Sequence, residues 1–252
     1  MTDPFFMNSY LGKRILALVR EGDYAHAGEE EAIALAMAPV AKDARRRILD
    51  CGCGRGGTAA YMQAGGWGSV TGIDIEPKAV DHARATYPEA TFLQCDIAEV
   101  AARFEEPFDV VTMFNVFYAL PDHSAALRAL AGVSGPNAQL VIFDYLDPGG
   151  YQDAPMMDGD IRFLPNPVPL AGLGETLASG GWRLQSVKDL SADYVRWYAA
   201  LVAEIEAKRD EIVALAGGDI YEHVRGLYAG LEAAVREKRV GGAVIYAEKA
   251  GP

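Results

Sequence analysis

Short hydrophobic runs alternate with segments of helical composition between residues 47 and 145. Such runs, bounded by glycine, proline and polar residues, are typical of buried strands, and the segments between them have the length of helices. Strands that alternate with helices predict βαβ units and a parallel sheet with both faces covered. With two later strand-like runs, we expect a doubly wound α/β fold around a mostly parallel, seven-stranded sheet. The expected strands lie at 48–49, 69–73, 91–93, 108–113, 139–143, 182–187 and 241–248, and the expected helices at 57–63, 77–87, 124–130 and 173–180.

The segments before and after this core have a different pattern of residues. Residues 28–37 open with glycine and three glutamates and continue with apolar residues, which predicts a helix with acids in its first turn. Residues 147–169 contain five prolines and no clean period, and they are long for a connecting loop. From Ser191, the expected N-cap, two apolar stripes follow at helical spacing, separated by Gly217 and Gly218. We therefore expect one compact domain with a core of 41–146, 170–190 and 240–250, a helical N-terminal segment at 1–40, and lid or cap insertions at 147–169 and 191–238.

Composition and charge narrow the class of partner. The 252 residues are 50% hydrophobic and carry a net charge of −12. Binding to nucleic acid or to an anionic membrane surface needs clustered lysine and arginine, and the only dense cluster is 45–47. Three cysteines cannot form a disulfide framework, and the Cys51–Cys53 pair lacks the second ligand pair of a zinc site. We expect a soluble, cytoplasmic protein with a small-molecule substrate and no metal, and both a monomer and a homodimer remain open.

The first strand-to-helix turn carries the clearest chemical signal. It reads Asp50-Cys51-Gly52-Cys53-Gly54-Arg55-Gly56-Gly57. Glycines let the backbone turn tightly and approach a ligand, and the helix that follows offers free N–H groups. Gly52, Gly54 and Gly57 also fit the dinucleotide pattern, with Asp74 at the place of a ribose-binding acid. The turn alone therefore leaves two classes of ligand open.

Two further acids separate these interpretations. Asp50 stands directly before the glycine turn, where a carboxylate would repel a pyrophosphate but suits an ammonium group. Asp96 follows the third strand, where it could accept a hydrogen bond from an adenine amino group. With Asp74 near the ribose, the three acids predict a cationic amino-acid nucleoside as the ligand.

On these motifs, the chain resembles the class I S-adenosylmethionine-dependent methyltransferases, across residues 47–145. The resemblance implies a Rossmann-like fold and S-adenosyl-L-methionine as the cofactor. It implies that the glycine turn holds the methionine portion, Asp74 the ribose hydroxyls and Asp96 the adenine amino group, while Ile75 packs on the adenine. The cofactor-binding residues implied in this way are Asp50, Gly52, Cys53, Gly54, Gly56, Asp74, Ile75, Cys95, Asp96, Ile97, Asn115 and Val116.

The flanks have a weaker resemblance to small-amine N-methyltransferases of the phosphoethanolamine type, around Tyr24 and at 143–145 and 188–194. Those enzymes have a histidine just after the fourth strand, whereas this chain has Ala119 at the matching position and His123 four residues later. Because Ala119 replaces this histidine, the resemblance does not establish that the chain acts on the substrate of those enzymes. The expected substrate-contacting residues are Tyr118, Asp144, Tyr145, Arg162 and Tyr194.

Methyl transfer from a sulfonium is an in-line displacement in which the protein mainly aligns and desolvates the reactants. An amine or hydroxyl acceptor must also lose a proton, and the candidates for the base are His123, Tyr24, Tyr10 and Tyr118. The acidic residues at 147–160 slightly favour an amine substrate. The remaining histidines, His26, His82 and His223, are interpreted as lying on exposed helical faces or loops.

The leading hypothesis is therefore methyl transfer from S-adenosylmethionine to a nitrogen or oxygen of a small molecule. Three alternatives stay open at this point. They are a small-molecule O-methyltransferase of secondary metabolism, an NAD(P)-dependent oxidoreductase on the same fold, and a non-catalytic S-adenosylmethionine-binding protein.

Overall fold

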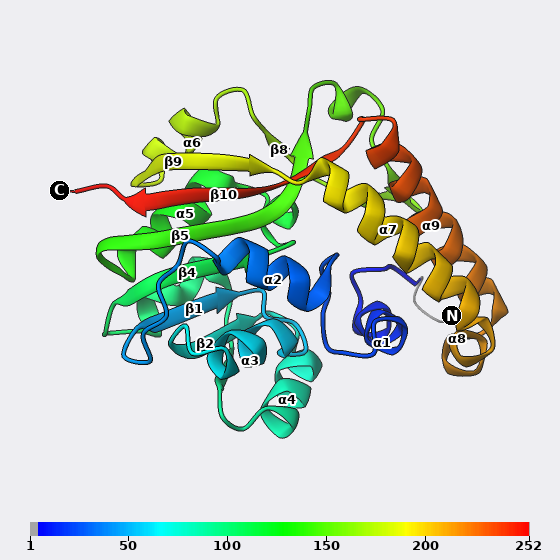
Figure 1. Cartoon of the computed structure of the whole chain (residues 1–252), viewed down its shortest axis with the longest axis horizontal. Coiled ribbons are helices and arrows are strands. Elements are labelled where there is room, and N and C mark those ends of the chain that lie inside the picture. Colours follow the sequence, from blue (N-terminus) through cyan, green and yellow to red (C-terminus); the bar gives the residue numbers. More distant parts are fainter. Residues whose placement is uncertain (1–4, 252) are drawn as a thin grey trace.

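The computed structural model describes residues 5–251, and a central sheet organises them (Figure 1). Its strand order is β3-β2-β1-β4-β5-β10-β9, and the short β8 also pairs with β5. All neighbours are parallel except β10, which runs antiparallel to both β5 and β9. The predicted doubly wound, mostly parallel sheet is confirmed. The strands of this sheet are β1 (Arg47–Cys51), β2 (Ser69–Asp74), β3 (Thr91–Gln94), β4 (Phe108–Phe114), β5 (Ser134–Asp147), β8 (Val168–Pro169), β9 (Trp182–Asp189) and β10 (Gly241–Lys249).

Helices cover both faces of the sheet because its strands are apolar on both sides. In β1, Ile48 and Leu49 are both fully buried, yet they belong to two different hydrophobic clusters. Successive side chains of a strand point to opposite faces, so each cluster lies on one face. The first cluster includes residues of α2 (Glu29–Met37), α3 (Gly57–Ala64) and α4 (Pro77–Thr86). The second includes residues of η1 (Ile97–Ala102), α5 (His123–Gly132) and α6 (Leu173–Ser179).

A helical cap extends beyond the carboxyl ends of the central strands (Figure 1). It consists of α7 (Ser191–Ala207), α8 (Arg209–Ala216) and α9 (Gly218–Arg236), and α1 (Tyr10–Val19) packs against α7 and α8. Two helices were expected here, but the backbone leaves helical geometry at Lys208 and divides the first of them. The predicted break at Gly217 is confirmed. The helix α1 has its own apolar stripe, Ile15, Leu16 and Val19, which the sequence analysis left unassigned within 1–40.

The expected N-cap at Ser191 is wrong. Ser191 is already the first residue of α7, and Leu190 occupies the cap position without a side-chain hydrogen bond. The Ser191 hydroxyl instead accepts a hydrogen bond from the Gly242 amide at 3.3 Å. The Ser191 side chain therefore contacts the distant strand β10 and does not cap its own helix.

The segment after β5 is more ordered than its proline content predicts. It contains η3 (Tyr151–Asp153) and a two-stranded sheet of β6 (Met157–Asp158) and β7 (Ile161–Arg162). Asp158 is almost fully buried, and it accepts hydrogen bonds from the Met7 amide at 2.7 Å and His223 Nε2 at 2.6 Å. The segment is thus attached to both the N-terminal segment and α9.

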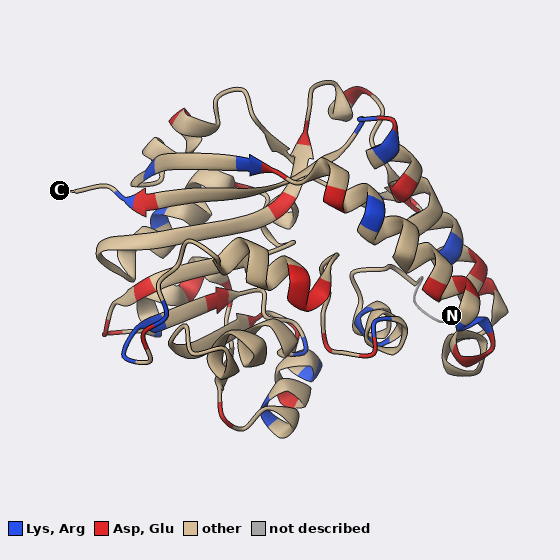
Figure 2. Cartoon of the chain, viewed as in Figure 1, with Lys and Arg blue, Asp and Glu red and all other residues tan. Residues whose placement is uncertain are grey.

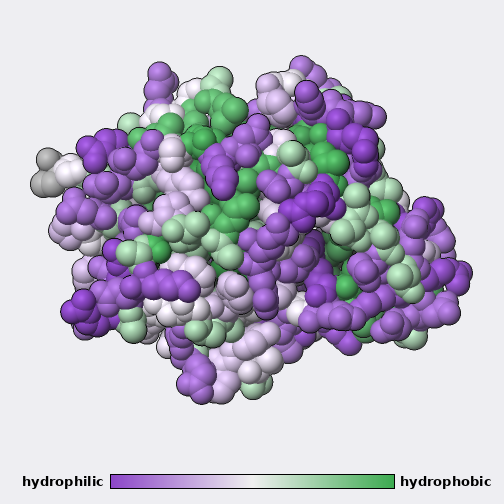
Figure 3. All heavy atoms as spheres, viewed as in Figure 1, coloured by the Kyte–Doolittle hydropathy of each residue, from purple (hydrophilic) through white to green (hydrophobic). Residues whose placement is uncertain are grey.

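Charged residues of both signs are interspersed along the ribbon (Figure 2), and hydrophilic residues cover most of the face seen in Figure 3. None of the helices between residues 5 and 251 combines the length and apolarity that a bilayer-spanning segment requires.

Candidate active site

The site begins at the glycine turn between β1 and α3. Gly52 and Gly54 have φ values of 69° and 55°, in the left-handed region that favours glycine. A Cβ on Gly52 would lie 2.3 Å from Val116 Cγ2, so the turn packs directly against the segment that follows β4. Because Gly52 has no side chain, the ends of the two neighbouring strands β1 and β4 can lie close together.

Two buried polar groups at these strand ends have no hydrogen-bond partner among the residues that the structure describes. Asp50 is 2% exposed; its Oδ1 accepts a hydrogen bond from Thr112 Oγ1 at 2.8 Å, and its Oδ2 has no partner. Burial raises the pKa of Asp50 to about 7. Asn115, with a left-handed φ of 53°, has an unpartnered Nδ2. A buried acceptor and a buried donor in this place fit an α-amino-acid group, whose ammonium and carboxylate would satisfy them.

Asp74 lies at the end of β2, on the same edge of the sheet. Its carboxylate accepts hydrogen bonds from the amides of Gly54 at 2.8 Å and Glu76 at 2.9 Å. The ammonium of Lys13 on α1 lies 3.1 Å from Asp74 Oδ2, a pairing that the sequence analysis missed. The next residue, Ile75, is 68% exposed, as a side chain that packs on a flat ring would be.

The predicted adenine-contacting residues follow β3, which pairs with β2. Asp96 is exposed and caps η1 through the Ala98 amide at 2.9 Å. Cys95 and Ile97 are buried on either side of it, and desolvation raises the pKa of the Cys95 thiol. Since β2 and β3 are neighbours, Asp74 and Asp96 lie on one edge of the sheet, as expected from parallel strands.

The N-terminal segment crosses the start of α3. The Asp23 carbonyl accepts a hydrogen bond from the Gly57 amide at 3.3 Å, and Asp23 Oδ1 lies 2.6 Å from Arg55 Nε in the glycine turn. Two of the tyrosines proposed as bases lie in this segment. Arg55 Nη1 donates to the Tyr10 hydroxyl at 3.4 Å, and the Tyr24 hydroxyl donates to Glu30 at 3.0 Å. Burial and the Glu30 carboxylate raise the pKa of Tyr24, so this phenol stays protonated.

His123 begins α5 and lies against the segment that follows β4. Its ring stacks on Phe117 with centroids 3.9 Å apart, and its Nε2 lies 2.9 Å from the Phe117 carbonyl oxygen. A carbonyl can only accept, so Nε2 carries the proton and Nδ1 keeps its lone pair. Burial lowers the pKa of His123, which favours the neutral ring.

Asp144 is buried beneath the same segment. Its Oδ2 accepts hydrogen bonds from the amides of Val116 at 3.1 Å and Tyr118 at 3.2 Å, and its Oδ1 from the Tyr145 amide at 2.7 Å. Desolvation raises its pKa to about 7. Both oxygens of this expected substrate residue are therefore engaged with backbone amides, and they fix the path of the chain after β4.

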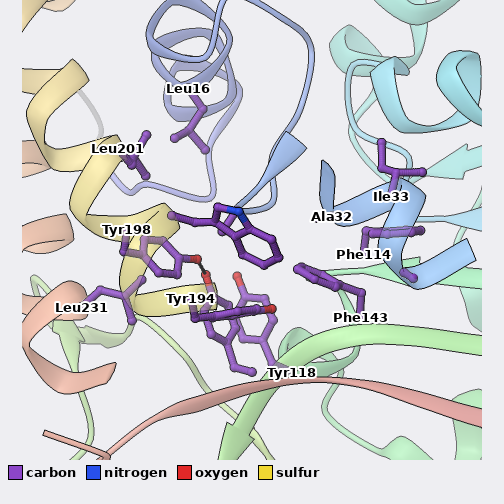
Figure 4. Close-up of a cluster of buried hydrophobic side chains, with 14 of the residues drawn as sticks. Leu16, Ala32, Ile33, Phe114, Tyr118, Phe143, Tyr194, Tyr198, Leu201 and Leu231 are labelled. Atoms are coloured by element: carbon purple, nitrogen blue, oxygen red, sulfur yellow. Dashed lines mark hydrogen bonds between the residues drawn. The ribbon is translucent and has the colours of Figure 1, made fainter. Parts of the chain in front are cut away.

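Three of the expected substrate residues converge in a cluster of tyrosines between α7 and the sheet (Figure 4). Tyr118 and Tyr145 meet edge to face with centroids 5.0 Å apart, and the Tyr194 hydroxyl donates to Asn115 Oδ1 at 3.4 Å. Tyr198 completes the cluster through a hydrogen bond between its hydroxyl and that of Tyr145. The fifth expected residue, Arg162, is exposed in β7 and contacts Gln152 instead.

The prediction of an exposed His26 is wrong. The residue is 1% exposed, with its Nδ1 3.1 Å from the Ala27 carbonyl oxygen and its Nε2 3.0 Å from Thr58 Oγ1 on α3. Burial lowers its pKa to about 3, so the ring is neutral. His82 and His223 are also bound, to Asp23 and Asp158, respectively. Apart from the adjacent Ala27, these partners are far away along the chain, and local sequence gave no sign of them.

Comparison with known proteins decides the family. A family model described as a methyltransferase domain matches residues 24–187. The chain belongs to this methyltransferase family. The expected family is thereby confirmed.

Curated methyltransferases match over part of their length. A ubiquinone biosynthesis O-methyltransferase of Alkalilimnicola ehrlichii is 37% identical over 106 residues, which cover 40% of this chain and 42% of that protein. The corresponding protein of Aeromonas salmonicida is 36% identical over 101 residues, 38% of this chain and 42% of the relative. The chain thus spans less than half of the length of these relatives.

Solved methyltransferase structures share the whole fold. The cyclopropane synthase MmaA2 of Mycobacterium tuberculosis has a TM-score of 0.80 at 16% identity, covering 96% of this chain and 95% of its own. A phosphoethanolamine N-methyltransferase of Haemonchus contortus has a TM-score of 0.82 at 14% identity, covering 97% of this chain and 58% of its own. At these identities, the likeness establishes the Rossmann-like methyltransferase fold.

Proposed function

We propose that this protein transfers a methyl group from S-adenosyl-L-methionine to a nitrogen or oxygen of a small molecule by in-line displacement. The observation that carries the proposal is the pair of unpartnered buried groups, Asp50 Oδ2 and Asn115 Nδ2, at the ends of neighbouring strands. When bound, the cofactor supplies a methyl group already activated on a sulfonium. The protein then has to hold, orient and desolvate the two reactants.

The cofactor would lie along the carboxyl edge of the sheet, and its parts would contact the ends of successive strands. Asp50 would accept from the ammonium, the exposed Ile75 would pack on the adenine, and Asp74 would exchange part of its pairing with Lys13 for the ribose hydroxyls. Asp96 has an exposed carboxylate for the adenine amino group. The other proposed cofactor contacts are Gly52, Cys53, Gly54, Gly56, Cys95, Ile97, Asn115 and Val116.

The N-terminal segment 1–40 would close over the cofactor, with its part between residues 5 and 40 as the cover that the structure describes. The Asp23–Arg55 ion pair and the Lys13–Asp74 ion pair both join it to the proposed cofactor site. These pairs support a cover that excludes water from the sulfonium. Exclusion of water strengthens each electrostatic contact inside the site.

The acceptor would bind among the tyrosines, in a chamber completed by 147–169 and 191–238. Burial raises the pKa of Tyr118, Tyr145 and Tyr194, so each phenol is neutral and can both donate and accept a hydrogen bond. Asp144 supports this chamber through its backbone contacts, and Arg162 at its exposed rim could meet an incoming anion.

We propose His123 as the base that removes the acceptor's proton. Its Nδ1 has no assigned proton, and its ring is neutral near pH 7. Tyr24 serves better as a hydrogen-bonding partner, since burial and the Glu30 carboxylate raise its pKa. Tyr10 accepts a hydrogen bond from Arg55. The curated relatives favour oxygen as the acceptor atom, and the resemblance of the flanking segments favours nitrogen.

The deciding experiment is incubation of the protein with isotopically methyl-labelled S-adenosylmethionine and a metabolite pool, followed by mass analysis. The expected result is one class of singly methylated product, whose fragmentation identifies nitrogen or oxygen. Tight cofactor binding without any labelled product would assign the protein to the non-catalytic alternative. Absence of cofactor binding would refute the site itself.

A further inference from the structure

Arg20, at the carboxyl end of α1, has a buried guanidinium that the proposed cofactor site does not use. Its side chain is 3% exposed, and its Nη1 forms an ion pair with Glu29 Oε1. Its Nε–H has no hydrogen-bond partner. Within residues 5–251, the only buried side-chain polar atoms without a partner are this Nε, Asp50 Oδ2 and Asn115 Nδ2. The latter two fit the cofactor's amino-acid group, so the guanidinium alone needs a different explanation.

The surroundings of Arg20 are aromatic and polar at once. The phenols of Tyr198, Tyr228 and Tyr145 are its electrostatic neighbours. They come from α7, α9 and β5, and Tyr198 stacks between the rings of the other two at centroid distances of 6.3 Å. Among residues 5–251, Glu29 is the only carboxylate paired with Arg20; it is 36% exposed and stands at a left-handed φ of 41°. The guanidinium thus has one counterion and three phenols near enough to act on it electrostatically.

One buried donor in this place has no acceptor. The hydroxyls of Tyr145 and Tyr198 bond to each other, and each can both donate and accept a hydrogen bond. In the part of the chain that the structure describes, the Arg20 Nε–H has no acceptor. Buried donors without acceptors are costly in a folded protein, and anionic oxygens satisfy them.

The same tyrosines connect Arg20 to the reacting end of the site. Tyr194 stacks obliquely beside Tyr198, with centroids 5.7 Å apart, and its hydroxyl donates to Asn115 at the proposed cofactor site. A molecule placed along the tyrosines would therefore have one end near the methyl donor and the other near Arg20.

We propose that Arg20, together with the Tyr145–Tyr198 hydroxyl pair, binds an anionic group of the methyl acceptor, either a carboxylate or a phosphate. This inference rests on the proposed function and adds the substrate class to it. The planar guanidinium would share its donors between Glu29 and the incoming oxygens, as arginine forks do with carboxylates and phosphates. A neutral acceptor would give the Nε–H a weaker partner than an anionic oxygen does and would bind less tightly.

The test measures binding of acetate and of inorganic phosphate to the full chain by calorimetry, with S-adenosylhomocysteine bound. We expect wild-type protein to bind one of the two anions and thereby to identify the group. Arg20→Met should weaken that binding by about tenfold or more, and Arg20→Lys should restore part of it. Arg14→Met is the matched control, because Arg14 is an exposed arginine on the same helix.

Affinity for S-adenosylhomocysteine separates the two proposals. If wild-type protein does not bind S-adenosylhomocysteine, the proposed function fails before the anion is tested. If it binds S-adenosylhomocysteine but neither anion, or if Arg20→Met binds the anion as well as Arg14→Met does, the anion site is overturned. Should Arg20→Met be too unstable to purify, Tyr198→Phe replaces it, since this change removes one hydroxyl and keeps the ring. Retention of full anion binding by Tyr198→Phe would then refute the site.

Discussion

Asp50→Asn should stabilise the cofactor-free protein at neutral pH while it weakens cofactor binding. The carboxylate is buried, and its pKa rises from 3.8 to about 7. At about 1.4 kcal/mol per pH unit, this difference corresponds to about 4 kcal/mol. Below pH 4, both the folded and the unfolded chain hold the proton, so the difference has no effect on stability there.

Between pH 4 and pH 7, the unfolded chain releases the proton and the folded chain keeps it. The free energy of unfolding therefore falls as pH rises through this window, and the loss is complete above the folded pKa. The asparagine variant has no proton to release at this position. At pH 8, its free energy of unfolding should exceed that of wild-type protein by up to about 4 kcal/mol, and the two should converge near pH 4.

Urea unfolding of the cofactor-free protein at pH 4, 6 and 8 measures this difference, and calorimetry with S-adenosylmethionine measures the cost to binding. The amide cannot neutralise the ammonium, so the affinity should fall. Asp81→Asn, an exposed carboxylate on α4, changes the net charge equally and serves as the control. Equal stabilisation at all three pH values, or unchanged cofactor affinity, would show that Asp50 does not carry a buried charge for the ligand.

Three further changes test other parts of the site. Asp74→Ala should weaken cofactor binding by about 1.5 to 3 kcal/mol through loss of charge-assisted hydrogen bonds, and unchanged affinity in calorimetry would place the ribose elsewhere. Lys13→Met should speed hydrogen exchange of the α1 amides relative to those of β1, because it removes the ion pair with Asp74; equal exchange would show that packing alone docks α1. His123→Ala should lower turnover at saturating cofactor without changing cofactor affinity, and the acidic limb of the wild-type pH–rate profile should lie below pH 6.5, because burial lowers the histidine pKa and the neutral ring is the active form. Unaltered turnover would assign His123 to packing against Phe117.

Local patterns predicted the elements that depend on local physics. The run at 108–113 became β4 with one more residue, since two-sided burial demands a continuous apolar strand. The glycine turn was also evident, because left-handed backbone at Gly52 and Gly54 restricts these positions to few residue types. By contrast, β5 runs for 14 residues where five were expected, because its pairing with β4 begins at Ser134 and its pairing with β10 continues to Leu146.

The fold class, the turn and the three acids at the strand ends could be predicted from the amino-acid sequence. The hydrophobic period, the glycine geometry and the parallel topology depend on neighbouring residues. Only the tertiary structure decided which partner each side chain meets. It buried His26 against Thr58, paired Lys13 with Asp74 and left the Arg20 Nε without an acceptor. These contacts join residues that lie far apart along the chain, or depend on what surrounds them in space, and hydrophobic periodicity carries no information about either.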